Sequence, residues 1–128
     1  MSNKPEYIYI KELQKNDKIP AKMIKYHVKD NKKLGIEKLK CVIRVNFSYD
    51  NNTNFDVVGD HSGENTEQLV VLAMIYNGNN QLIGMKSDAK ISAGFTGRDT
   101  FTIEYLEAPI DETISYIDIR VIKDPAIW

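Results

Sequence analysis

Apolar and polar side chains alternate between Leu39 and Tyr49, and this alternation constrains the fold more than any other feature of the chain. The apolar positions are Leu39, Cys41, Ile43, Val45, Phe47 and Tyr49, separated by Lys40, Val42, Arg44, Asn46 and Ser48. A period of two residues is that of a β-strand with one face against a core and the other toward water. We therefore predict a half-buried strand over this stretch.

Further runs of strand length follow, separated by Gly, Asn, Asp or Pro. Leu69 to Tyr76 is almost wholly apolar, which predicts a central strand covered on both faces. Asn77 to Gln81 provides the Asn and Gly residues of a tight hairpin leading into Leu82 to Met85. Other strands are predicted at Tyr7 to Ile10, Met23 to Val28, Ala89 to Ile91, Thr100 to Leu106 and Ile114 to Ile122, with turns at Gly94 to Gly97 and at Pro109.

Helical periodicity is confined to Glu6 to Lys15, and Asp50 to Gln68 is predicted to be a long irregular loop. The connections after residue 69 are too short for the helices of a parallel α/β fold. We therefore predict an all-β, antiparallel, immunoglobulin-like sandwich of about seven or eight strands with at most one short helix. Its predicted core contains Cys41, Ile43, Val45, Phe47, Val71, Ala73, Ile75, Phe101, Ile103, Ile117 and Ile119.

A length of 128 residues predicts a single domain, 1–128, with the basic segment 1–38 folded onto it. The first forty residues hold eleven Lys and five acidic residues, but the whole chain has a net charge of -1. That balance removes the usual reason to expect a nucleic-acid or anionic-membrane partner. Because apolar residues interleave with the lysines, we interpret these as solvated strand faces that discourage edge pairing.

The single cysteine, Cys41, cannot form an internal disulfide, which favours a reducing compartment. The chain begins without an apolar run of signal-peptide length, and Leu69 to Tyr76 is too short to span a membrane. The expected location is cytoplasmic for the sequence as given, and extracytoplasmic if it is a fragment or lacks a signal peptide.

Two stretches resemble a known family. Leu69-Val-Val-Leu-Ala-Met-Ile-Tyr-Asn-Gly-Asn-Asn-Gln-Leu-Ile-Gly84 and Ile91-Ser-Ala-Gly-Phe-Thr-Gly-Arg-Asp-Thr-Phe-Thr-Ile103 are similar to the small bacterial immunoglobulin-like sandwiches of the FxLYD type. In the motif itself, read here as Ala73 to Asn77, only Tyr76 matches. The resemblance implies a fold and no chemistry, and such modules commonly lie outside the membrane.

Asp50, Asn52, Asn54 and Asp56 place oxygen-bearing side chains at every second position, as at the start of a calcium loop. An EF-hand would need Gly and Glu where this chain has Phe55 and His61. Local turns of a solvated loop are the main interpretation. A different calcium site, completed by Asp60 and Glu64, is left open.

No catalytic or cofactor signature is found. Asp60-His61-Ser62 contains the residue types of a hydrolase triad, but adjacent side chains cannot align in a relay. His27 and His61 with one cysteine do not make a zinc set, and Cys41 is expected to be a buried, unreactive thiol. Gly94 to Arg98 is expected to be a turn between strands rather than a phosphate loop.

The predicted function is therefore a non-enzymatic module, without metal or cofactor, that binds either another protein or a second copy of itself as a homodimer. The alternative is a carbohydrate or small-ligand binding module that uses exposed aromatic residues. The candidate interaction residues are Tyr76, Tyr105, Tyr116 and Trp128, for which core packing is the competing interpretation. Trp128, at the chain end after Pro125, is expected to fold back onto the sandwich or to dock into a second subunit.

Overall fold

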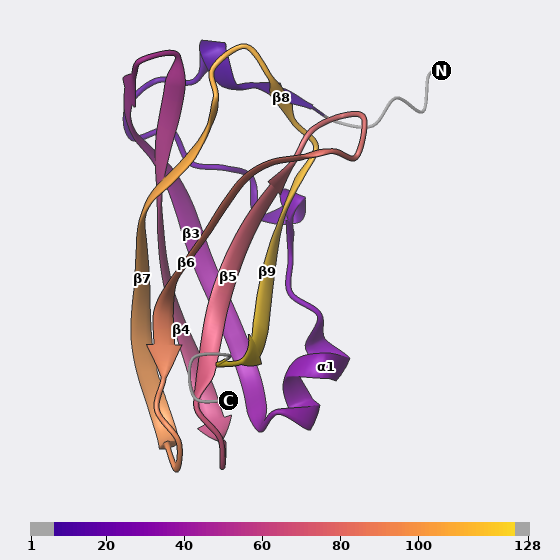
Figure 1. Ribbon diagram of the computed structural model, residues 1–128, viewed down its shortest axis with the longest axis vertical. Coiled ribbons are helices and arrows are strands. Elements are labelled where there is room, and N and C mark those ends of the chain that lie inside the picture. Colours follow the sequence, from indigo (N-terminus) through magenta and orange to yellow (C-terminus); the bar gives the residue numbers. More distant parts are fainter. Residues whose placement is uncertain (1–6, 125–128) are drawn as a thin grey trace.

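A computed structural model describes residues 7–124, which form two large packed β-sheets and one small two-stranded sheet (Figure 1). The four-stranded sheet has the order β2-β9-β5-β6, and the three-stranded sheet has the order β3-β4-β7. The described strands are β1 Ile8–Tyr9, β2 Ile24–Lys25, β3 Ile36–Tyr49, β4 Asn52–Glu64, β5 Leu69–Tyr76, β6 Leu82–Ile91, β7 Thr96–Pro109, β8 Thr113–Ile114 and β9 Tyr116–Lys123. The prediction of an all-β sandwich is confirmed.

The only α-helix among the described residues is α1, Val28–Lys33, and 3-10 turns occur at Ile10–Glu12 and Ala21–Met23. The helical pattern at Glu6 to Lys15 therefore predicted the wrong segment. One pair departs from the antiparallel prediction, because β2 runs parallel to β9. The short strands β1 and β8 pair with each other across one end of the sandwich.

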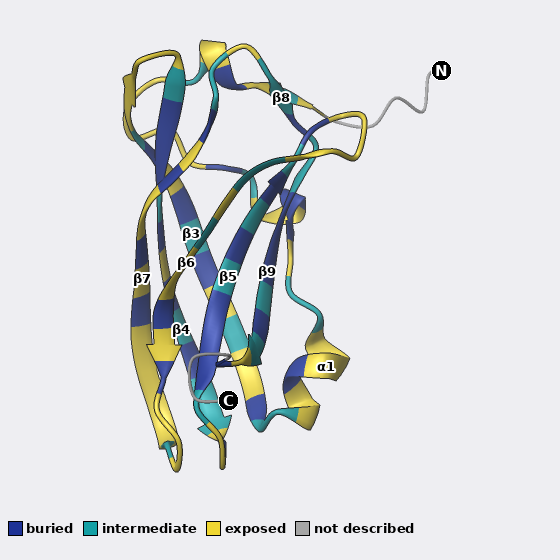
Figure 2. Ribbon diagram, in the orientation of Figure 1, coloured by how far each residue is buried: buried dark blue, intermediate teal, exposed yellow. Residues whose placement is uncertain are grey.

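The core lies between the two sheets, and Figure 2 shows buried and exposed positions alternating along their strands. Every residue of the predicted core is buried except Phe47, which is 40% exposed. The prediction that β5 is covered on both faces is wrong for its outer face, where Leu72, Met74 and Tyr76 are only half-buried. Its inner face is fully buried, as expected for a strand between β9 and β6.

The predicted loop from Asp50 to Gln68 is wrong, because β4 occupies most of it as the central strand of the three-stranded sheet. Its inner positions, such as Phe55 and Val57, are buried, while Asp56 and Val58 face outward. Gly59 leaves room for the sheet partner: a β-carbon there would lie 2.5 Å from the ring of Phe101. Because Asn, Asp and Gly are uncommon in strands, the residue propensities of this stretch do not predict one.

Two β-bulges turn aromatic residues out of the core. The first lies between Val45 and Phe47, where β3 and β4 lose register. The second lies in β7 at Tyr105, which has a positive φ of 61°. Because side chains alternate along a strand, one extra residue moves the following side chain to the opposite face. Phe47 and Tyr105 therefore meet outside the sheet, with ring centroids 6.2 Å apart at 73°.

The free edge of β3 is covered by the N-terminal segment rather than by another strand of its sheet. The Ile19 amide donates to the Ile43 carbonyl, and the Val45 amide donates to the Asp17 carbonyl, both at 2.9 Å. Further along the edge, the Tyr26 hydroxyl bonds the backbone of Cys41. The basic segment 1–38, as far as it is described, thus closes one side of the sandwich and protects an edge that could pair with another chain.

Candidate functional site

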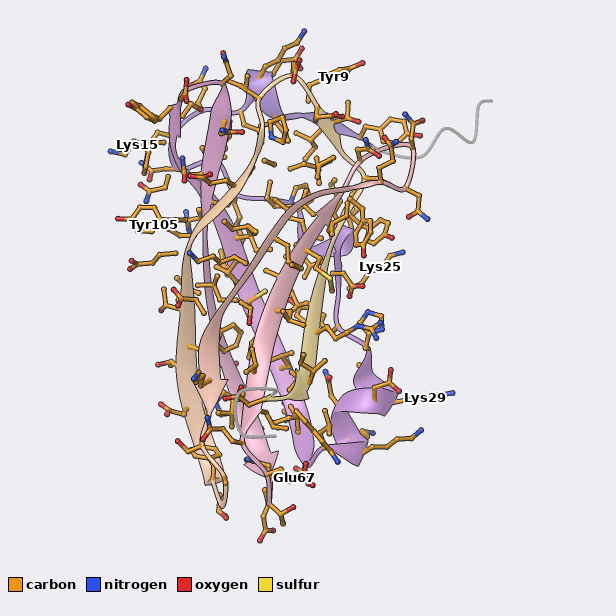
Figure 3. The ribbon with its side chains drawn as sticks, viewed as in Figure 1. Tyr9, Lys15, Lys25, Lys29, Glu67 and Tyr105 are labelled. Atoms are coloured by element: carbon orange, nitrogen blue, oxygen red, sulfur yellow. The ribbon has the colours of Figure 1, made fainter. Side chains whose placement is uncertain are left out.

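The four candidate interaction residues do not form one surface. Tyr76 on β5 and Tyr116 on β9 are register partners, and their rings stack with centroids 4.8 Å apart at 16°. Tyr105 lies on β7 in the other sheet and projects from the opposite side of the ribbon to Lys25 in Figure 3. Trp128 lies outside the described residues. The structure therefore joins two of the four on the outer face of the four-stranded sheet.

A cation extends the tyrosine stack to a third strand. The ammonium of Lys25 on β2 lies 4.0 Å from the ring centroid of Tyr116. Because the strand order is β2-β9-β5, Lys25 and Tyr76 occupy opposite faces of the Tyr116 ring. The Tyr116 hydroxyl donates to Asn80 Oδ1 at 2.7 Å. Desolvation raises the pKa of Tyr116, and the neighbouring Tyr76 and Asp118 add to that rise.

Apolar side chains continue this row along β5 and β6. Met74 and Met85 are register partners, and Leu82 lies opposite Tyr76. Met85 is 57% exposed and Leu82 is 48% exposed. We call this surface the tyrosine face and define it by Lys25, Met74, Tyr76, Leu82, Met85 and Tyr116. It combines residue types that are enriched at protein interfaces, namely Tyr and Met, with a cation at one end.

A charged cluster that sequence reasoning missed lies beside the tyrosine face. His27 Nε2 bonds to Asp118 Oδ1, and Nη2 of Arg120 lies 3.2 Å from both ring nitrogens of His27. His27 adopts a left-handed conformation with φ 55° at the start of α1. The cluster therefore ties the beginning of α1 to β9. Since the partners are 91 and 93 residues apart, no local sequence pattern marks the contact.

His61 is a buried core histidine. It is 4% exposed, its ring lies 5.0 Å from that of Phe95, and its Nδ1 has no hydrogen-bond partner. Burial lowers its pKa, against smaller opposing effects of Asp99 and Asp60. The alternation of β4 sends His61 inward and Asp60 outward. The residue types of the apparent triad thus face opposite sides of one sheet.

Cys41 lies in the core, 6% exposed, on the inner face of β3. Its amide donates to the Tyr26 hydroxyl at 3.1 Å, and that hydroxyl donates to the Cys41 carbonyl at 3.3 Å. Burial raises the pKa of the Cys41 thiol to about 11 and that of the Tyr26 phenol to about 12. A thiol so rarely ionised is a weak nucleophile, so the pair is structural.

The residues of the open calcium alternative lie on a hairpin and strand instead of a loop. Asp50 is in the β3–β4 turn with φ 51°, and Asn52, Asn54 and Asp56 belong to β4. Within residues 7–124, no group of three or more His, Cys, Asp or Glu side chains is arranged to hold a metal ion. The turn predicted over Gly94 to Arg98 is confirmed only at its start, where the Gly94 amide donates to the Asn65 carbonyl, because Thr96, Gly97 and Arg98 belong to β7.

Comparisons with protein-family models, with curated proteins and with solved structures find no match for this chain. The resemblance to FxLYD-type sandwiches therefore stays a prediction. In the part of the chain that is described, no helix has the length and apolar character needed to cross a membrane.

Proposed function

We propose that the protein is a non-enzymatic module that binds another protein through the tyrosine face. The observation that carries this proposal is the Lys25–Tyr116–Tyr76 stack, continued by exposed Met85 and Leu82. Rings held by neighbours on a rigid sheet lose little conformational freedom on binding. Tyrosines in such a setting supply both apolar contact and a hydroxyl, which is why they are frequent hot spots at protein interfaces.

The stack favours a protein over a carbohydrate as the partner. A pyranose would need a free ring face on which to lie, yet both faces of Tyr116 are occupied, one by Tyr76 and the other by Lys25. Cations rim this side of the molecule: Lys25 and Lys29 both project from it in Figure 3, and α1 also carries Lys32 and Lys33. The partner surface proposed is therefore an apolar patch flanked by carboxylates.

Leu82→Asp tests this proposal, with Tyr9→Asp as the matched control, because each residue is 48% exposed. The wild type and both variants are immobilised, exposed to a lysate of the source cells, and any captured protein is purified and titrated. We expect saturable binding that Leu82→Asp weakens by roughly 30-fold or more, through a charge left without a partner, and that Tyr9→Asp leaves intact.

The wild type and a further variant, Tyr76→Ala, are applied to a glycan array. Saturable binding to a sugar that Tyr76→Ala abolishes would favour the carbohydrate alternative. A captured protein that binds wild type and Leu82→Asp equally would show that the tyrosine face is not the interaction surface.

A further inference from the structure

The outer face of the three-stranded sheet, opposite to the tyrosine face, carries its own exposed apolar residues. Val58 in the middle of β4 is 52% exposed, and the two residues displaced by the bulges, Phe47 and Tyr105, are 40% and 53% exposed. Beside Val58 lies a hollow of about 400 Å³ whose lining includes Val42, Arg44 and Asp56. Monomeric proteins seldom leave apolar side chains grouped in this way in the centre of a sheet face.

Charges on this face are separated across the strands. Lys18, in the segment that lies along β3, pairs with Arg44 of β3 through an isolated antiparallel β-bridge of the backbone. Arg44 is in turn the register partner of Asp56 on β4. Glu104 follows on β7, opposite the bulge beside Asp56. One row therefore reads basic, basic, acidic, acidic from one side of the sheet to the other.

Asp56, in the acidic half of the row, has a side-chain oxygen without a partner among residues 7–124. Asp56 Oδ1 is buried without a hydrogen bond, and no ion pair within residues 7–124 joins Asp56 to Arg44, although they face each other in the register. A buried carboxylate oxygen without a hydrogen bond lowers the stability of the fold, and a hydrogen-bond donor from a partner would remove that cost. Because Asp56 and Arg44 both line the hollow, a donor that enters it would reach the carboxylate.

The register of β3 and β4 makes this face complementary to itself. Three successive outward pairs are Lys40 with Asp60, Val42 with Val58, and Arg44 with Asp56. Consider a two-fold axis that runs parallel to the strands, just outside the sheet and above the line between β3 and β4. This axis places β3 of one copy over β4 of the other, so that each member of a pair faces the other member of that pair in the second copy. Arg44 then faces Asp56 of the second copy, Lys40 faces Asp60, which also pairs with Arg98 of its own chain at 2.7 Å, valine faces valine, and Lys18 faces Glu104.

We propose that a second copy of this chain docks on the outer face of the three-stranded sheet and forms a two-fold symmetric dimer. The area is adequate: the strands pair over twelve positions, and at about 3.4 Å per residue and about 4.8 Å per strand the three strands cover roughly 600 Å². A standard interface covers about 800 Å² per partner. Sheets packed face to face in this way form the cores of β-sandwiches. The dimer leaves the tyrosine face free, so the proposal is independent of the proposed function.

The first test measures the dimerisation constant by sedimentation equilibrium for the wild type, Val58→Asp and Met85→Asp. The last is the matched control, because Met85 is 57% exposed on the opposite sheet. We expect a wild-type dimer, a dissociation constant raised about 30-fold or more by a buried unpaired charge in Val58→Asp, and no change in Met85→Asp. A wild-type monomer at 0.1 mM or so, or a dimer weakened only by Met85→Asp, overturns the proposal.

A charge exchange tests the two-fold arrangement itself and uses only exposed residues, whose replacement leaves folding intact. Lys18 and Glu104 are separated within one chain by β3 and β4, so they cannot pair intramolecularly. Lys18→Glu and Glu104→Lys should each weaken the dimer severalfold at low salt, and the double variant should return the dissociation constant to the wild-type value. A double variant weaker than either single variant contradicts the symmetry.

Discussion

The Tyr26 hydroxyl takes the place of a neighbouring strand at the free edge of β3, which makes Tyr26→Phe an informative substitution. In the native protein this one hydroxyl accepts a hydrogen bond from the Cys41 amide at 3.1 Å and donates one to the Cys41 carbonyl at 3.3 Å. Phenylalanine keeps the ring and its packing but removes both bonds. The variant therefore isolates the contribution of a side chain that satisfies a strand edge.

The expected loss is about 2 kcal/mol of unfolding free energy. A typical intramolecular hydrogen bond contributes about 1 kcal/mol net, and a buried backbone group left without a partner costs about 1–3 kcal/mol. Cys41 is 6% exposed, so water replaces the hydroxyl poorly, whereas Tyr26 itself is half-buried. Against a total stability of about 5–15 kcal/mol, a loss of this size is readily measured.

Urea titration of wild type, Tyr26→Phe and Tyr49→Phe provides the assay. Tyr49 is 75% exposed, so its hydroxyl loss should change stability by no more than about 0.5 kcal/mol. The midpoint of Tyr26→Phe should fall while the m-value stays constant, and the Cys41 amide should exchange its hydrogen faster than in the wild type. Equal stability of the two variants, or an unchanged Cys41 exchange rate, would refute the reasoning.

Three further outcomes are expected. Burial lowers the pKa of His61 below its ordinary 6.5, so the unfolded chain takes up a proton at this residue before the folded protein does. The stability of the wild type relative to His61→Phe should therefore be constant above pH 6.5 and decrease below it. A difference that stays constant in urea titrations from about pH 8 to 5 contradicts this. Cys41, with a thiol pKa of about 11, should react with a disulfide reagent at neutral pH only when urea unfolds the protein, and rapid labelling of the native form would disprove its burial. Gly59→Ala should cost about 2–4 kcal/mol, because its β-carbon would lie 2.5 Å from Phe101 and 2.6 Å from the Lys40 carbonyl; thermal unfolding within a degree of wild type would exclude that clash.

Local patterns predict the strands whose apolar residues alternate without interruption. The stretch from Leu39 to Val45 and the inner face of β5 are buried as their periods indicate. The same reasoning fails for β4, which contains many Asn, Asp and Gly residues. Its place between β3 and β7 supplies the backbone hydrogen bonds and the packing that its residue propensities do not.

The candidate site was likewise predictable from the sequence only in part. Tyr76 and Tyr116 could be named from their residue type and strand context, but their stacking depends on the register between β5 and β9, which lie forty residues apart in the sequence. The cluster of His27, Asp118 and Arg120 has no sequence signal, because its members meet only when β2 lies parallel to β9.

The sequence by itself determined that this chain folds as an all-β sandwich, because the period of its apolar residues and the chemistry of its turns are local properties. Only the tertiary structure decided which face each aromatic residue occupies. Bulges at Val45–Phe47 and at Tyr105 reverse the alternation, and a bulge is defined by the pairing of two strands rather than by either strand alone. The surfaces proposed for binding were therefore fixed by strand register, a long-range property that composition and periodicity do not encode.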